Sequence, residues 1–134
     1  MALSPEKAVV LRNLLLVGSG GFLGSIARYY VSRLNLLVDV LSVPAGTLLV
    51  NVAGSFLIGF LAGVSDKSDI LPGEWRLFLM TGLCGGFTTF SSFTNESMVL
   101  LHNGQMLSFL LYTGLSLFLG LAAVFLGFSL TNLL

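Results

Sequence analysis

The sequence predicts an all-α membrane protein with four spanning helices, the third of which is broken. The 134 residues are 55% hydrophobic and only 9% charged, which is unsuited to a soluble surface. Spanning roughly 30 Å of hydrocarbon takes about 20 apolar residues, and four such stretches use nearly the whole chain. The third stretch contains glycines and hydroxyl side chains that disfavour a continuous helix. We expect residues 1–134 to form one transmembrane domain, with spans at about 11–34, 45–64, 74–101 and 106–134.

The first predicted span, 11–34, is rich in glycine. Its glycines form rows of small residues four positions apart, which let helices approach closely: Gly18, Gly20, Gly21 and Gly24. Arg28 and Tyr29 follow as part of a basic and aromatic edge that is typical of the lipid headgroup region. Arg28 is therefore interpreted first as an interfacial anchor, with an anion-attracting vestibule residue as the alternative.

The second predicted span, 45–64, carries no charge and one strongly polar side chain, Asn51. Thr47 lies one turn earlier, so both side chains face the same way from a helix. A single hydroxyl in a span ordinarily bonds to its own helix or to a neighbouring one. The alternative is that Thr47 and Asn51 border a narrow polar path.

The third predicted span, 74–101, is interrupted near its middle. Gly82, Gly85 and Gly86 are followed at once by the polar run 88–96 (TTFSSFTNE). Broken backbone at membrane depth is tolerated only where protein or a water-filled path satisfies it. We therefore expect a break in this stretch, beside a polar track that includes Thr88, Ser91 and Ser92.

Two further features of the third span are candidates for function. Phe90 and Phe93 lie three positions apart and project to nearly the same side of a helix. Such a pair usually packs against lipid or core, but the positive edges of aromatic rings also suit a small anion. Glu96 is the one carboxylate predicted inside a span, and an intramembrane acid is a functional candidate by default. Its alternative is a hydrated or hydrogen-bonded position near the helix end.

The fourth predicted span, 106–134, has no charged residue. Tyr112, Ser116 and Gly120 are spaced four apart and share one helical face. The two hydroxyl groups extend the candidate polar track onto this span.

The same sequence excludes several other function classes. No run of Lys or Arg offers a surface for nucleic acid. A single cysteine, Cys84, and a single histidine, His102, give no metal-ligand set. No combination of Ser, His and Asp and no phosphate-binding loop is present, so we do not expect an enzyme.

These residues together resemble the CrcB or Fluc family of fluoride channels. The resemblance covers essentially the full chain, and its most specific part is the block in the third span. The matching blocks are 20–24 (GGFLG) with Arg28 and Tyr29, 46–51 (GTLLVN), 82–93 (GLCGGFTTFSSF), and Tyr112 with Ser116.

The resemblance implies a passive, fluoride-selective channel that exports fluoride across the bacterial cytoplasmic (inner) membrane and relieves fluoride toxicity. It implies a dual-topology homodimer, with two antiparallel subunits enclosing two pores. It places these residues along the fluoride paths: Asn51, Phe90, Phe93, Tyr112 and Ser116. It also implies a structural sodium ion at the dimer centre, bound by the backbone carbonyls of Gly85 and Thr88.

The charge distribution agrees with dual topology. If both termini lie on one side, four basic residues lie there, and Arg28 and Arg33 lie toward the other: Lys7, Arg12, Lys67 and Arg76. Basic residues in loops set the orientation of a membrane protein, and this bias is small. A weak bias permits insertion in both orientations.

Two other functions compete with the channel. A small multidrug-type exporter coupled to protons is also a short four-helix dual-topology dimer, but it requires a carboxylate midway along the first span. No Asp or Glu lies between Leu11 and Leu37. A noncatalytic scaffold subunit of a larger membrane complex would suit the glycine-rich faces, but the polar break would then have no function.

Overall fold

The computed structural model describes residues 4–37, 39–67 and 71–133. The first helix, α1 (Pro5–Ser32), starts earlier than predicted and continues into a 3₁₀ turn, η1 (Arg33–Leu36). A two-residue antiparallel hairpin follows, β1 (Asp39–Val40) with β2 (Val43–Pro44). It leads into α2 (Ala45–Lys67), the second predicted span.

The third span forms as several short pieces rather than one helix. Thr88 and Thr89 are extended, with ψ angles of 157° and 117°, and they separate the helical pieces before and after them. Gly104, at φ 72°, turns the chain toward the last helix, a conformation in which a side chain would be strained. In chain order the elements are α3 (Gly73–Arg76), the π-helical η2 (Leu77–Cys84), α4 (Gly85–Phe87), α5 (Phe90–His102), α6 (Met106–Leu130) and the 3₁₀ turn η3 (Thr131–Leu133).

The break is thus confirmed, but it lies after the glycines and not at them. Gly82 and Gly86 are helical, and each packs on the backbone of α1. A Cβ on Gly82 would lie 2.8 Å from the Val17 carbonyl oxygen, and one on Gly86 would lie 2.5 Å from that of Gly21. These glycines therefore permit close helix packing, and the helix ends at Thr88 and Thr89, whose hydroxyls cap the helical pieces on either side.

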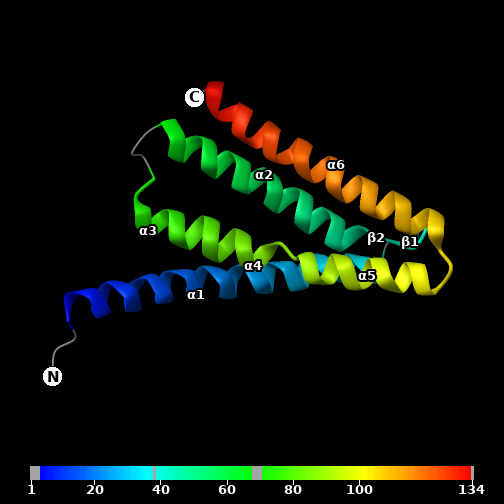
Figure 1. The fold of residues 1–134 in the computed structure, drawn as a ribbon, viewed down its shortest axis with the longest axis horizontal. Helices are drawn as coiled ribbons and strands as arrows, with labels where there is room; N and C mark the ends of the chain where they lie inside the picture. Colours follow the sequence, from blue (N-terminus) through cyan, green and yellow to red (C-terminus); the bar gives the residue numbers. More distant parts are fainter. Residues whose placement is uncertain (1–3, 38, 68–70, 134) are drawn as a thin grey trace.

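The helices form two parallel pairs (Figure 1). The third span, from α3 to α5, runs beside α1 in the same direction. Helices α2 and α6 also run parallel to each other, in the direction opposite to that of the first pair. Both described chain ends lie at one end of the long axis, as the charge argument assumed. The break between α4 and α5 lies near the middle of the molecule's length, so it falls inside the span.

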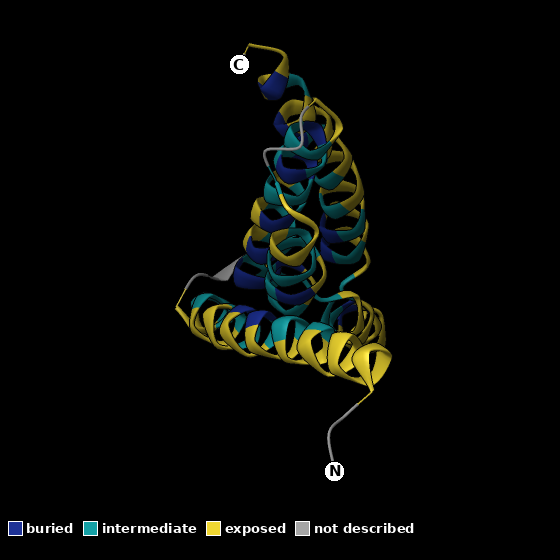
Figure 2. Cartoon of the chain, turned by 90° about the vertical axis from the view of Figure 1, so that its left-hand side faces the viewer, coloured by how far each residue is buried: buried dark blue, intermediate teal, exposed yellow. Residues whose placement is uncertain are grey.

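The burial pattern is that of a membrane protein. Three helices are long and apolar enough to cross a membrane: residues 5–36, 45–67 and 106–133. Large apolar side chains point outward from them, including Leu14 (64% exposed), Phe118 (70%) and Leu121 (73%). Figure 2 shows exposed residues along much of α1 and on the outer sides of the other helices. Such continuous apolar surface requires lipid or a second subunit to cover it.

Basic side chains neutralise helix ends near the chain termini. Lys67 Nζ donates to the Thr131 carbonyl oxygen (2.7 Å), and Arg76 Nη2 donates to that of Ser65 (3.2 Å). Cations are favourable at the carboxyl ends of helices, where carbonyl groups lack helical donors. Arg12 also pairs with the carboxylate of Glu74.

Candidate functional site

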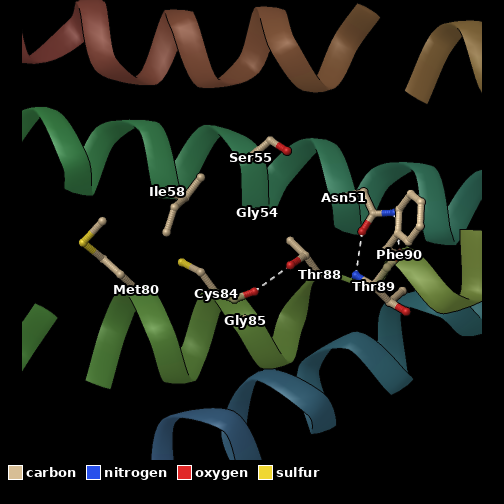
Figure 3. Close-up of a pocket in the computed structure, with 10 residues that line it drawn as sticks. All are labelled: Asn51, Gly54, Ser55, Ile58, Met80, Cys84, Gly85, Thr88, Thr89 and Phe90. Carbon is tan, nitrogen blue, oxygen red and sulfur yellow. Dashed lines mark hydrogen bonds between the residues drawn. The ribbon is translucent and has the colours of Figure 1, made fainter. Parts of the chain in front are cut away.

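The break in the third span is held by the side chain of Asn51. Asn51 Nδ2 donates to the Thr89 carbonyl oxygen (3.0 Å), and the Thr89 N–H donates to Asn51 Oδ1 (2.8 Å) (Figure 3). The carboxamide thereby satisfies both backbone groups of a residue that has left the helix. These two bonds explain why a polar residue lies in the middle of α2. The place of Asn51 along a pore stays a prediction.

Threonine side chains close the two helix ends at the break. Thr88 Oγ1 donates to the Cys84 carbonyl oxygen (2.9 Å), at the end of the first helical piece. Thr89 is the N-cap of α5, and its Oγ1 accepts from the Ser92 N–H (3.2 Å) and donates to Ser92 Oγ (3.0 Å). Ser91 Oγ lies 3.4 Å from the same oxygen. These hydroxyls therefore lie beside the break, where the sequence predicted a polar track.

The same caps release two carbonyl groups from helical bonding. In a continuous helix the Gly85 carbonyl would accept from the Thr89 N–H, and the Thr88 carbonyl from the Ser92 N–H. Those donors go to Asn51 Oδ1 and Thr89 Oγ1 instead. The carbonyls of Gly85 and Thr88 are the two that the family resemblance assigns to sodium, so this backbone fits a hard cation, which prefers oxygen ligands.

A cavity of about 340 Å³ opens at the break between α2 and the third span. Asn51, Gly85, Thr88, Thr89 and Phe90 are among its lining residues, and Figure 3 shows them grouped around it. The structure thus brings an asparagine, an aromatic ring and free carbonyl groups to one place.

Three aromatic rings lead from the surface to the interior. Phe90 is 75% exposed, and its ring centre lies 5.8 Å from that of Phe93. The Phe93 ring in turn lies 5.3 Å from that of Tyr112, which is fully buried. The predicted pair on α5 is therefore confirmed as a ring contact, and it extends onto α6.

The carboxylate of Glu96 forms the centre of a hydrogen-bonded cluster. Tyr112 Oη donates to Glu96 Oε2 (2.7 Å), and Thr47 Oγ1 donates to Glu96 Oε1 (2.8 Å). Asn35 Nδ2 also donates to Glu96 Oε1 (3.1 Å). Glu96 is thus hydrogen-bonded, although it lies in the middle of α5 and not near a helix end, and its functional role stays a prediction. Residues from α2, α6 and the turn after α1 converge on this carboxylate.

Asn35 is the member of this cluster that the sequence did not reveal. It lies in the 3₁₀ turn after α1, just beyond the end of the predicted first span, where an asparagine is unremarkable. Its contacts with Thr47 and Glu96 join positions far apart in the chain. No periodicity or motif places these residues together.

Arg28 makes a contact that the sequence did not predict. Its Nε donates to the carbonyl oxygen of Gly86 (3.0 Å), so it ties α1 to the helix end just before the break. Its role as an anchor or a vestibule residue stays a prediction. Arg33 is exposed, and its Nη1 donates to Tyr29 Oη (3.0 Å). Both arginines border a second cavity of about 290 Å³, which Glu96 and Ser92 also line.

The buried hydroxyl of Ser116 stands apart from these networks. Its Oγ has no hydrogen-bond partner within 4–37, 39–67 and 71–133. An unpaired buried hydroxyl is costly, and it is available to a ligand or to water. Its assignment to the pore stays a prediction.

The comparisons with known proteins identify the family. The family described as "CrcB-like protein, Camphor Resistance (CrcB)" matches residues 15–128. The chain belongs to the CrcB family. Of its relatives, the "Fluoride-specific ion channel FluC" of Chlorobium luteolum is 47% identical over 115 residues, which cover 86% of this chain and 88% of that protein.

Two other CrcB relatives carry the same name. The one from Rhizobium meliloti is 48% identical over 121 residues, or 90% of this chain and 96% of that protein. The one from Chlorobium phaeobacteroides is 45% identical over 129 residues, or 96% and 98%. The resemblance found in the sequence is confirmed, and with its long apolar helices the chain is a multi-pass bacterial membrane protein.

Proposed function

We propose that the protein is a passive channel selective for fluoride, which exports the ion across the cytoplasmic membrane and so relieves fluoride toxicity. The relatives named as fluoride-specific channels match nearly the full chain, including the broken third span. The observation that carries the proposal is the ring series Phe90, Phe93 and Tyr112, which ends on the hydrogen-bonded carboxylate of Glu96.

The chemistry of this series suits a small, strongly hydrated anion. A selective path must replace the water around the ion with donors at close quarters. Ring edges, the second amide hydrogen of Asn51 and the hydroxyl of Ser116 supply weak positive charge without a buried cation. A buried cation would attract every other anion as well. The fluoride path therefore runs along Asn51, Phe90, Phe93, Tyr112 and Ser116, with Ser91 and Ser92 at the break.

A passive path needs no catalytic group and no coupling ion. Glu96 is held by Thr47 and Tyr112, so its bonded carboxylate is suited to orient those hydroxyls. An exporter that exchanges a proton for its substrate would instead need an acid that is free to change partners.

The functional unit is a homodimer of oppositely inserted subunits with two pores. The exposed apolar faces of α1 and α6 give such a dimer surface to bury. A sodium ion completes it, bound by the carbonyls of Gly85 and Thr88. Two oxygens from one chain are too few for a hard cation, so the site also takes the same groups of the second copy.

Fluoride efflux from liposomes containing the purified protein tests this function. A fluoride electrode follows release after the potential is relieved with a potassium ionophore, and chloride release is recorded in parallel. Rapid fluoride release with little chloride release, and with no proton gradient, is the expected result. Protein that is inserted and dimeric but releases no fluoride would overturn the proposal.

A further inference from the structure

The beginning of α2 is capped by a residue from another part of the chain. The residue just before α2 is Pro44, which has no side-chain acceptor for the first N–H groups of the helix. Asn35 Oδ1 accepts from the N–H groups of Gly46 (2.6 Å) and Thr47 (3.3 Å) instead. A Cβ on Gly46 would lie 2.9 Å from that oxygen, so the glycine leaves room for the cap.

The other end of the same carboxamide faces the carboxylate cluster. Asn35 Nδ2 donates to Thr47 Oγ1 and to Glu96 Oε1, both at 3.1 Å. One small side chain therefore joins the turn after α1 to the beginning of α2 and to α5. The Tyr112 hydroxyl holds the opposite oxygen of the carboxylate from α6.

The surrounding charges make the neutrality of Asn35 significant. Arg28 and Arg33 line the same cavity as Glu96, but Arg28 donates to the Gly86 carbonyl oxygen and Arg33 to Tyr29 Oη. Neither guanidinium has a hydrogen bond to Glu96 within the part of the chain that the structure describes. The carboxylate is thus held by neutral donors from three directions.

We propose that Asn35 is a positioning residue of the channel: its oxygen fixes the start of α2, and its amide fixes the Glu96 carboxylate that orients Thr47 and Tyr112. This inference rests on the proposed function, because Tyr112 lies on the fluoride path. The carboxamide oxygen and the amide nitrogen of Asn35 thus have separate tasks. A substitution that removes only the nitrogen and one that removes both atoms distinguish these tasks.

The Asn35→Asp variant keeps the capping oxygen but loses the donor to Glu96. Near neutral pH two carboxylates then face each other, Glu96 turns away, and fluoride efflux falls roughly tenfold or more, the scale of a lost hydrogen bond to a charged group. As the pH falls, a proton shared by the two carboxyl groups supplies the missing donor, and efflux recovers. The other ionisable groups near them are Tyr112, Arg28 and Arg33.

The measurement compares wild type with three variants, Asn35→Asp, Asn35→Ala and Asn103→Asp, in liposomes at about pH 7.5 and about pH 5.5. Asn103 is an exposed residue at the end of α5 and receives the same chemical change. Protein-free liposomes at each pH correct for hydrogen fluoride crossing the bilayer. The expected result is a deficit that recovers at low pH in Asn35→Asp alone, and one that persists in Asn35→Ala.

Thermal unfolding of the same proteins in detergent separates this inference from the channel function. Near neutral pH, Asn35→Asp is expected to unfold at a lower temperature than wild type. At low pH its unfolding temperature should rise to that of wild type, because its folded state takes up the shared proton. The Asn35→Ala deficit does not change with pH. If wild type released no fluoride, the unfolding result would still decide the role of Asn35. Equal behaviour of Asn35→Asp and Asn103→Asp in both measurements would overturn it.

Discussion

Two regions of the molecule are built on opposite physical principles. In the glycine interface, formed by Gly20, Gly24, Gly82 and Gly86, the backbones of α1 and the third span touch with no side chain between them. The polar region is formed by Asn51, Thr89, Phe90, Glu96 and Tyr112. There the Asn51 side chain bonds to the backbone of the broken helix, and Tyr112 bonds to Glu96 from another helix.

The difference shows how a short chain makes a rigid frame beside an ion path. Close backbone contact in a membrane gains dispersion energy and tolerates no added atom. A hydrogen-bonded polar region keeps its geometry only while each donor meets its acceptor. Substitutions in the first region should therefore affect folding, while those in the second should affect conduction.

The largest effect is expected from Gly24→Ala. An added Cβ would collide with the Leu83 carbonyl oxygen, so α1 must move away from the third span. Overpacking of this kind costs about 1–3 kcal/mol or more. Gly18→Ala is the matched control, because its Cβ would meet no atom within 4 Å, and alanine is the better helix former by about 1 kcal/mol.

Thermal unfolding of both glycine variants in detergent is the measurement. The expected unfolding temperature is lower for Gly24→Ala and unchanged or higher for Gly18→Ala. Equal stability of the two proteins would mean that this interface is looser than the structure shows.

The next largest effect is expected on conduction from Asn51→Asp. The carboxylate still accepts from the Thr89 N–H, so the protein stays folded, but it no longer donates to the Thr89 carbonyl, and it repels an anion. Fluoride efflux is expected to be abolished. An unchanged rate in correctly assembled protein would remove Asn51 from the path, and Asn103→Asp controls for the added charge.

Phe90→Ile sharpens the distinction between conduction and stability. Phe90 is 75% exposed within the subunit, so losing its ring should change the free energy of unfolding by less than about 1 kcal/mol. Efflux should still stop, because the ring edge is gone. Phe118→Ile, at a ring 70% exposed on α6, is the matched control and should conduct normally.

The smallest effect is expected from Ser116→Ala. The variant removes a buried hydroxyl that has no partner in the described part of the chain, so stability should stay the same or rise by up to about 1 kcal/mol. Efflux should fall several-fold if this hydroxyl contacts the ion. Ser19→Ala, which removes a hydroxyl bonded to the Leu16 carbonyl oxygen, should leave the rate unchanged.

The sequence predicted the spans better than it predicted the contacts. Apolar stretches and the polar run 88–96 were enough to indicate helices and a break, because hydropathy and helix propensity act locally. The glycines were misplaced as the break itself. Gly82 and Gly86 instead pack against α1, and a contact between distant segments leaves no mark on local propensity.

The candidate functional residues also divide into those that the sequence indicated and those that only the structure showed. Asn51 and Glu96 stood out because a polar or acidic residue in an apolar span must be explained. Asn35 gave no such signal, because an asparagine in a loop is ordinary until its partners are known. The bond from Arg28 to the Gly86 carbonyl could not be predicted either, because it depends on where the third span breaks.

By itself, the sequence determined that the chain lies in a membrane, where its helices run and that the third of them breaks. These properties follow from the transfer energy of apolar residues and from the helix propensity of each short segment. The tertiary structure alone decided which side chains satisfy the broken backbone, which carbonyls are released, and which neutral donors hold Glu96. Those outcomes depend on hydrogen bonds between residues far apart in the chain, and only the packing of the helices brings their atoms within about 3 Å.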